Sequence, residues 1–303
     1  LHKTNFKTVS DKNGLYSFDN VDKGEYTLKI TYIGYETFLK TIQLNAELTM
    51  DVKMNISSIL EDAVVISSTR FIGADKSASQ TLDIEEIKKV NLGQDIPYLL
   101  DQTPSMVVTS DAGAGIGYTN LRVRGSDMTR INFTVNGIPL NDPESHGVFF
   151  VNMGDFASSL NSIQIQRGVG TSTNGAAAFG ASINMQTTSL IKEPYAEVNT
   201  SFGSFNTQKY TLMTGTGLIN GKWSIDTRVS KLYSDGFVDR AYSDLKSLYT
   251  SAAYYGDRSI LRFTMFTGKE KTYQSWYGIP KDSLENNRTY NPYTYENETD
   301  NYQ

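Results

Sequence analysis

The feature that most constrains the fold of this chain is a long run of alternating residues between positions 195 and 268. Apolar residues or threonines occupy every second position at 196–202, 223–229 and 261–265. Successive side chains of a strand point to opposite faces, so each stretch predicts a strand with one apolar and one polar face. The dipeptide Asn220-Gly221 favours a tight hairpin turn between two of these strands. The run therefore predicts an antiparallel sheet.

The connections between these strands alternate in length. The turns at 220–221 and 256–258 are short, whereas the loop at 234–244 and the tyrosine-rich tail after Lys269 are long. Amphipathic strands with short turns on one side and longer loops on the other are typical of outer-membrane β-barrels. A soluble β-sandwich shows a similar alternation and stays open as an alternative. Asp226 and Arg228 on the polar face favour a water-lined lumen over a sandwich core.

The rest of the chain divides into three further segments. Residues 1–55 predict a partial all-β sandwich, because turn sequences separate short alternating runs such as 25–32. Residues 56–68 predict a linker with a short apolar run between serines. Residues 69–190 predict an α+β domain, which includes a helix over 83–90 with Asp83 as its N-cap. We therefore expect a mixed fold that ends in the first strands of a barrel over 191–303.

Composition excludes several classes of function. The 303 residues contain no cysteine and two histidines, and the net charge is −5. These numbers argue against thiolate or multi-histidine metal sites, and the acidic balance argues against nucleic-acid binding. The GxxxxG spacing at 170–175 is followed by Ala176 and Ala177, so the lysine of a phosphate-binding loop is missing. We find no catalytic constellation, and we expect no enzymatic activity, no cofactor and no metal site.

An ordered set of motifs identifies a family resemblance. The stretches NLRVRGSDMTRINFTVNGIPLND (120–142) and SIQIQRGVGTSTNGAAAFGASINMQTT (162–188) precede the alternating strands. This order resembles the plug domain and first barrel strands of TonB-dependent outer-membrane receptors. The stretch GLYSFDNVDKGEYTLKITYIGYET (14–37) resembles the carboxypeptidase-regulatory-like module, and together the two resemblances point to the Bacteroidetes type of receptor.

The resemblance implies roles for two groups of residues. Plug arginines of the family pair with acidic groups of the barrel wall, and their equivalents here are Arg122, Arg124 and Arg167. The linker matches the coupling box that the periplasmic energy-transducing TonB complex grips, and its residues are Glu61, Asp62, Ala63, Val64, Val65 and Ile66. A barrel of about 22 strands needs many more strands than residues 191–303 supply. We therefore expect a fragment truncated at both ends, with these arginines solvated or misplaced.

The resemblance also implies a function at the outer membrane, in contact with its lipid. We expect active import of a scarce nutrient, with siderophore-bound iron, haem or a cobalamin-like cargo favoured. A glycan importer is less favoured, because Gln164 and Gln166 stand where such importers carry acidic residues. A non-transporting surface-binding or adhesin protein is the alternative from another class. We expect the plug loops 110–118 and 141–150 to contact the cargo through Asp111, Gly113, Gly115, Tyr118, Asn141, Asp142 and His146.

Overall fold

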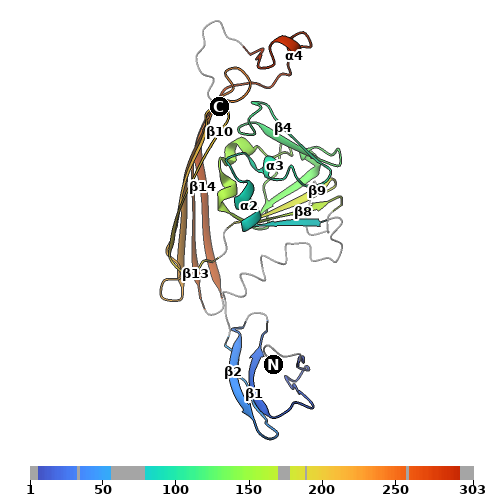
Figure 1. Cartoon of the computed structure of the whole chain (residues 1–303), viewed down its shortest axis with the longest axis vertical. Coiled ribbons are helices and arrows are strands. Elements are labelled where there is room, and N and C mark those ends of the chain that lie inside the picture. The colour runs from blue at the N-terminus through green and yellow to red at the C-terminus, as the bar shows by residue number, and fades with distance from the viewer. Residues whose placement is uncertain are drawn as a thin grey trace. The chain divides into compact units, whose positions relative to one another are not determined.

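A computed structural model describes residues 6–32, 35–55, 79–169, 178–187, 190–256 and 259–293 of the chain. The chain forms two compact units (Figure 1). One is an N-terminal unit of residues 1–65, and the other is built mainly from residues 66–254 and 261–303. Among the described residues, no helix is both long enough and apolar enough to cross a membrane.

The described part of the N-terminal unit contains one antiparallel strand pair, β1 (Gly24–Ile30) and β2 (Phe38–Leu44). The alternation at 25–32 predicts the first of these strands, and the structure confirms it. The segments 15–18 and 48–54 also alternate, but they are not strands in the structure. They still lie side by side, because the Tyr16 hydroxyl donates a hydrogen bond to the carbonyl of Met50 at 2.9 Å.

A mixed five-stranded sheet organises residues 79–187, in the order β3-β8-β9-β6-β7. Only the β6–β9 pair is parallel, and a separate hairpin joins β4 to β5. The strands are β3 (Ser79–Asp83), β4 (Met106–Ser110), β5 (Thr119–Val123), β6 (Ile131–Val135), β7 (Ile138–Pro139), β8 (Leu160–Arg167) and β9 (Ala181–Thr187). The helices are α2 (Ile84–Val90), α3 (Ile96–Leu99) and the short 3₁₀ helices η1 (Met128–Arg130), η2 (Phe150–Met153) and η3 (Phe156–Ser159).

The helix expected over 83–90 is confirmed as α2, and its start has a clear local cause. Asp83 and Glu86 form a capping box, in which each side chain accepts a hydrogen bond from the other residue's backbone N–H. Ile87 is the buried residue of this helix and joins the main hydrophobic core. That core includes Phe133 and Phe150, whose rings meet edge to face at 5.5 Å.

A second sheet of five antiparallel strands follows in sequence order. Its strands are β10 (Tyr195–Gly203), β11 (Thr207–Gly215), β12 (Trp223–Ser234), β13 (Ser243–Tyr255) and β14 (Ile260–Thr272). A short helix, α4 (Ser283–Asn286), lies in the segment after β14. Buried and exposed residues alternate along the strands, as the sequence pattern predicts.

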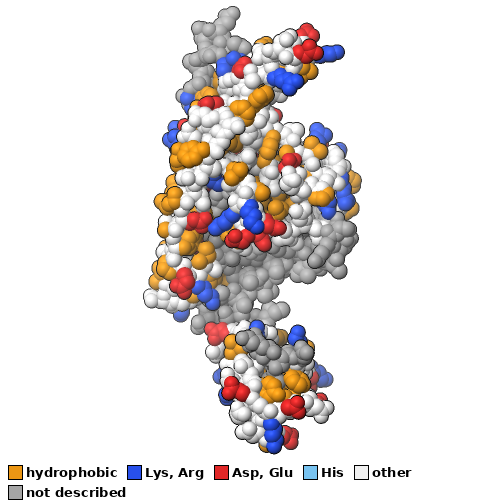
Figure 2. Space-filling view, viewed as in Figure 1, with side chains coloured by type: hydrophobic (Ala, Val, Ile, Leu, Met, Phe, Trp, Pro, Cys, Tyr) orange, Lys and Arg blue, Asp and Glu red, His pale blue; other side chains and the backbone are white. Residues whose placement is uncertain are grey.

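The two faces of this sheet have different surroundings. One face packs against the α+β domain, as Figure 1 shows, with Phe156 of η3 in contact with the rings of Tyr249 and Phe266. The opposite face carries exposed apolar side chains, among them Val198, Leu212, Val229, Leu261 and Phe263. Figure 2 shows hydrophobic side chains along the height of this sheet. An apolar face of this extent is unfavourable in water. It is typical of the outer face of a membrane β-barrel, which contacts lipid.

Candidate functional site

Two loops of the α+β domain converge on a hollow of about 300 Å³. The loop between β4 and β5 supplies Asp111 and Tyr118, and the loop after β7 supplies Ser145 and Phe149. Trp276, in the segment after β14, closes the hollow, and its ring meets the ring of Tyr118 edge to face at 5.5 Å. The hollow is therefore a small aromatic site with one carboxylate, formed by both the domain and the wall.

The first loop takes its shape from glycines at close approaches. Gly113 and Gly115 have φ angles of +74° and +75°, which side-chain-bearing residues rarely adopt. A Cβ on Gly113 would lie 2.8 Å from the side chain of Phe237, and one on Gly115 would lie 3.2 Å from the ring of Tyr98. These two predicted ligand residues thus bring the loop close to its neighbours, and they do not line the hollow.

The second loop is held by its own polar side chains. Asn141 accepts a hydrogen bond from the backbone N–H of Phe133 and donates to the carbonyls of Ile131 and His146. Asp142 accepts hydrogen bonds from the backbone N–H groups of residues 144 and 145, which lowers the pKa of its carboxyl. His146 is exposed with a φ of +59°. None of these three predicted ligand residues lines the hollow, so their ligand contact stays a prediction.

Burial sets the electrostatics of the hollow. Asp111 is partly buried, and burial raises the pKa of its carboxyl. Burial also raises the pKa of the Tyr118 hydroxyl, and the nearby carboxylates of Glu270 and Asp111 add to that shift. The Tyr118 hydroxyl therefore stays protonated at neutral pH and can donate a hydrogen bond to a ligand. Sequence reasoning missed Trp276, for which the tyrosine-rich tail was the only available signal.

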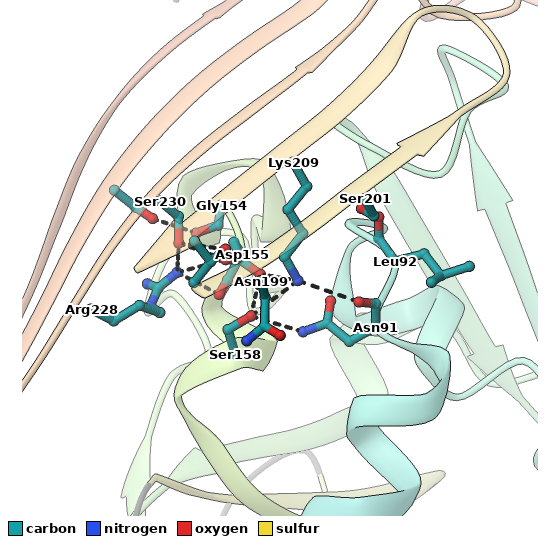
Figure 3. Close-up of polar contacts among 12 residues, drawn as sticks. Asn91, Leu92, Gly154, Asp155, Ser158, Asn199, Ser201, Lys209, Arg228 and Ser230 are labelled. Atoms are coloured by element: carbon teal, nitrogen blue, oxygen red, sulfur yellow. Dashed lines mark hydrogen bonds and ion pairs between the residues drawn. The ribbon is translucent and has the colours of Figure 1, made fainter. Parts of the chain in front are cut away.

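A second polar cluster joins the α+β domain to the sheet (Figure 3). Asp155, between η2 and η3, lies 2.9 Å from the Lys209 Nζ of β11 and 3.3 Å from an Arg228 nitrogen of β12. The hydroxyls of Ser158 and Ser230 each donate a hydrogen bond to the Asp155 carboxylate at 2.6 Å. All three charged side chains are at most 3% exposed.

The charges in this cluster do not balance, because one carboxylate faces two cations. Burial alone would raise the pKa of Asp155, but Lys209 and Arg228 hold it below its ordinary value. The second cation has other contacts that disperse its charge. Arg228 donates to the carbonyl of Asp155 at 2.6 Å, and its guanidinium carbon lies 5.9 Å from the centre of the Phe266 ring. Sequence reasoning picked out Arg228 on the polar face but missed Asp155, whose partners come from distant strands.

The predicted plug arginines lie elsewhere in the α+β domain. Arg122 and Arg124 are exposed, at and just beyond the end of β5. Arg167, the last residue of β8, donates a hydrogen bond to the carbonyl of Pro104 at 3.1 Å. The five strands described here give no test of their pairing with acidic wall groups, which stays a prediction. The predicted coupling segment, Glu61–Ile66, lies outside the described residues.

Comparisons with known proteins fit the two domains. Residues 1–66 match the model of the CarboxypepD_reg-like domain, and residues 74–182 match the model of the TonB-dependent receptor plug domain. No curated protein matches the chain in sequence. The fold resembles three solved receptors or transporters, each at less than 20% identity, so that these likenesses concern the fold alone.

The siderophore receptor PirA from Acinetobacter baumannii is 18% identical, with a TM-score of 0.53, and the match covers 68% of this chain and 34% of the PirA chain. The ferric yersiniabactin uptake receptor FyuA from Yersinia pestis is 12% identical, with a TM-score of 0.52, and the match covers 65% of this chain and 32% of the FyuA chain. The copper transporter OprC is 15% identical, with a TM-score of 0.54, and the match covers 66% of this chain and 32% of the OprC chain. The chain thus spans about a third of the length of each solved structure.

The α+β domain and the amphipathic sheet around it are the plug and part of the wall of an outer-membrane receptor. The order of the matched domains, with the CarboxypepD_reg-like domain before the plug, is the order that the sequence motifs indicate. Residues 74–182 are a TonB-dependent receptor plug domain that follows a CarboxypepD_reg-like domain, and the sheet after it has the fold of the corresponding strands in the solved receptors.

Proposed function

We propose that the receptor containing this chain imports a scarce nutrient across the outer membrane, driven by a periplasmic TonB complex. The observation that carries the proposal is the hollow lined by Asp111, Tyr118 and Trp276. It lies where plug loops meet the segment after β14, at the end of the sheet that carries the long connections. Long connections of outer-membrane barrels face the outside. A cargo bound there contacts the plug and the wall together.

The chemistry of the hollow favours a metal complex with a planar organic part. The edge-to-face pair of Tyr118 and Trp276 offers aromatic surface to a flat ligand, and the protonated Tyr118 hydroxyl offers a donor. Of the solved structures of similar fold, one is described as a siderophore receptor, one as a ferric yersiniabactin uptake receptor and one as a copper transporter. We therefore favour siderophore-bound iron, haem or a cobalamin-like cargo. Aromatic side chains also stack on sugars, so a glycan cargo is the alternative outcome.

For coupling, we propose that the TonB complex engages the segment Glu61–Ile66. This proposal rests on the sequence, because the segment is apolar enough to form a strand and lies between serines on both sides. An extended segment can accept a partner strand through backbone hydrogen bonds, whatever its side chains are. The small-molecule cargo and the TonB complex would then bind at two separate sites.

The cargo can be tested by titrating the purified full-length receptor with four probes: a ferric catecholate siderophore, haemin, cyanocobalamin and maltoheptaose. We expect one of the first three to bind and Trp276→Ala to weaken its binding roughly tenfold or more, as loss of an aromatic anchor does. Tyr290→Ala is the matched control, because Tyr290 is an aromatic of the same segment that does not line the hollow. Binding of maltoheptaose alone, or equal affinity in both variants, would contradict the proposal.

A further inference from the structure

Three lysines gather on the lipid-facing side of the sheet. Lys231 of β12 and Lys246 of β13 are direct cross-strand partners. Lys269 of β14 lies beside them, because a Cβ on its neighbour Gly268 would lie 2.7 Å from the Lys246 carbonyl oxygen. All three lysines are exposed, and all three line one open hollow of about 680 Å³. The three residues Lys231, Lys246 and Lys269 are called the lysine row below.

The protein pairs only one of the three charges of the lysine row. The Asp244 carboxylate lies 3.9 Å from the Lys231 Nζ. Among the described residues, no ion pair involves Lys246 or Lys269. Like charges directly opposite one another on neighbouring strands destabilise a sheet. An anion from outside the chain would offset this repulsion.

The position of the lysine row along the strands matches a membrane interface. The aromatic pair Trp223 and Tyr254 lies on the same face at the other end of the same strands, with ring centres 4.6 Å apart. Lys231 lies eight positions after Trp223 in β12. The distance between them is about 27 Å along the strand, or about 20 Å along the membrane normal at a strand tilt of about 40°. Together with the reach of a lysine side chain, this separation is close to the roughly 25 Å height of the apolar band of such barrels.

The lysine row lies at the outer of the two interfaces. The connection at 235–242 and the segment after Thr272 begin three or four residues beyond the lysines. Trp223 lies at the opposite end of β12, next to the tight turn that its bridge to Ile219 closes, and Tyr254 lies at the end of β13 that faces β14 across their connection. Long loops of outer-membrane barrels face the outside, so the lysines face the outer leaflet.

The surroundings of the lysine row fit an amphipathic anion. The same hollow is lined on its membrane side by the apolar side chains of Leu212, Val229 and Leu248. Cations at the interface and apolar side chains below them complement an anionic head group with acyl chains. We propose that the lysine row is a binding site for a phosphorylated glycolipid of the outer leaflet, with its phosphate between the lysines and its acyl chains along the apolar strand surface.

The proposal can be tested by native mass spectrometry of the full-length receptor in detergent, with bisphosphorylated lipid A as the probe. We expect the triple variant K231Q/K246Q/K269Q to lose at least tenfold in affinity for lipid A. The triple arginine variant at the same positions keeps the charge, and we expect it to bind within about twofold of the wild type. K192Q/K222Q/K281Q removes the same charge from exposed lysines elsewhere, and we expect it to bind as the wild type does.

Two further lipids, measured with the wild-type receptor alone, test the identity of the ligand. We expect dephosphorylated lipid A to bind at least tenfold more weakly than the phosphorylated form, and cardiolipin to compete poorly. Equal binding of both lipid A forms, equal competition by cardiolipin, or an equal loss in the charge-matched control would overturn the proposal. Heat-modified mobility on gels confirms that each variant barrel is folded, and the wild-type arms decide the question if the glutamine variant fails to fold.

Discussion

At the scale of single residues, the plug is fixed to the wall by one buried carboxylate. Asp155 forms ion pairs with Lys209 of β11 and Arg228 of β12. Its backbone is in the left-handed region, with a φ of +51°. A non-glycine residue in that conformation is strained, and the strain persists where the surroundings over-determine the backbone. The number of contacts around Asp155 meets that condition.

We expect Asp155→Asn to loosen the plug from the wall. The variant leaves Lys209 and Arg228 buried without a counter-charge. Removal of one partner of a buried ion pair lowers the free energy of unfolding by about 3–5 kcal/mol. Hydrogen exchange in the full-length receptor should show faster exchange at 150–160 in this variant. Asp101→Asn, at an exposed aspartate of the plug, is the control and should exchange as the wild type does. Unchanged protection in Asp155→Asn would show that the cluster does not hold the plug.

Acid should have the same effect as this substitution. The pKa of Asp155 is lowered in the folded protein, so its contribution to stability is present above the ordinary carboxyl pKa of about 4. That contribution is lost as the pH falls through the lowered value. Hydrogen exchange at 150–160, corrected for the intrinsic rate, should therefore stay slow from pH 7 to about 4 in the wild type. Faster exchange already at pH 6 would contradict the assignment.

A second buried aspartate should respond to pH in the opposite direction. Asp95 is 5% exposed and accepts a hydrogen bond from Thr119 at 2.9 Å, and burial raises its pKa well above the ordinary value. A raised carboxyl pKa stabilises the fold at low pH, and this stabilisation is lost as the pH rises through the raised value. We expect protection at 92–103 to fall as the pH rises in the wild type and to stay flat in Asp95→Asn. Parallel pH profiles in the two proteins would refute this prediction.

At the scale of elements, the two faces of the sheet divide the roles of its residues. Inward positions such as Lys209 and Arg228 contact the plug, and outward positions such as Val229 form the exposed apolar face. Because the side-chain period of a strand is two, a shift of register by one residue would exchange these roles. The cross-strand register is therefore fixed by the plug on one side and the membrane on the other.

A charge on the outward face should be tolerated according to its depth. We expect Val229→Arg to destabilise the folded receptor by about 2–4 kcal/mol, because it lies near the middle of the apolar band, and Tyr233→Arg to cost about 0–1 kcal/mol near the interface. Equilibrium unfolding in urea from lipid vesicles measures both values. Equal costs at the two positions would mean that the strand does not cross the membrane as described.

Local patterns predict the elements well, and they predict the site poorly. The capping box at Asp83 and the alternation in β10 and β12 depend on neighbours in sequence, and the structure confirms both. Asp95 precedes α3 but does not cap it, because its side chain accepts a hydrogen bond from Thr119, and α3 ends at Leu99. The hollow combines Asp111 with Trp276, which are 165 positions apart. No local pattern encodes that contact, so sequence reasoning named Asp111 and Tyr118 of the hollow but missed Trp276.

At the scale of the whole molecule, we propose that cargo recognition and energy coupling use separate sites. The hollow around Trp276 takes the cargo, and the segment Glu61–Ile66 takes the TonB complex. The two activities should therefore separate by mutation. A variant that cannot pair with the TonB complex should still hold its cargo at the cell surface.

The most direct test of this claim measures surface binding and uptake together in cells that carry the full-length receptor with Val64→Pro. Proline removes a backbone donor and fixes φ, so it breaks a strand pairing, whereas the control Val64→Ala keeps the donor. The radiolabelled probe is the member of the cargo panel that binds the purified receptor. We expect Val64→Pro cells to bind the probe as the wild type does and to import none of it, and Val64→Ala cells to import it. Import by Val64→Pro cells at the wild-type rate, or loss of surface binding in them, would contradict the account.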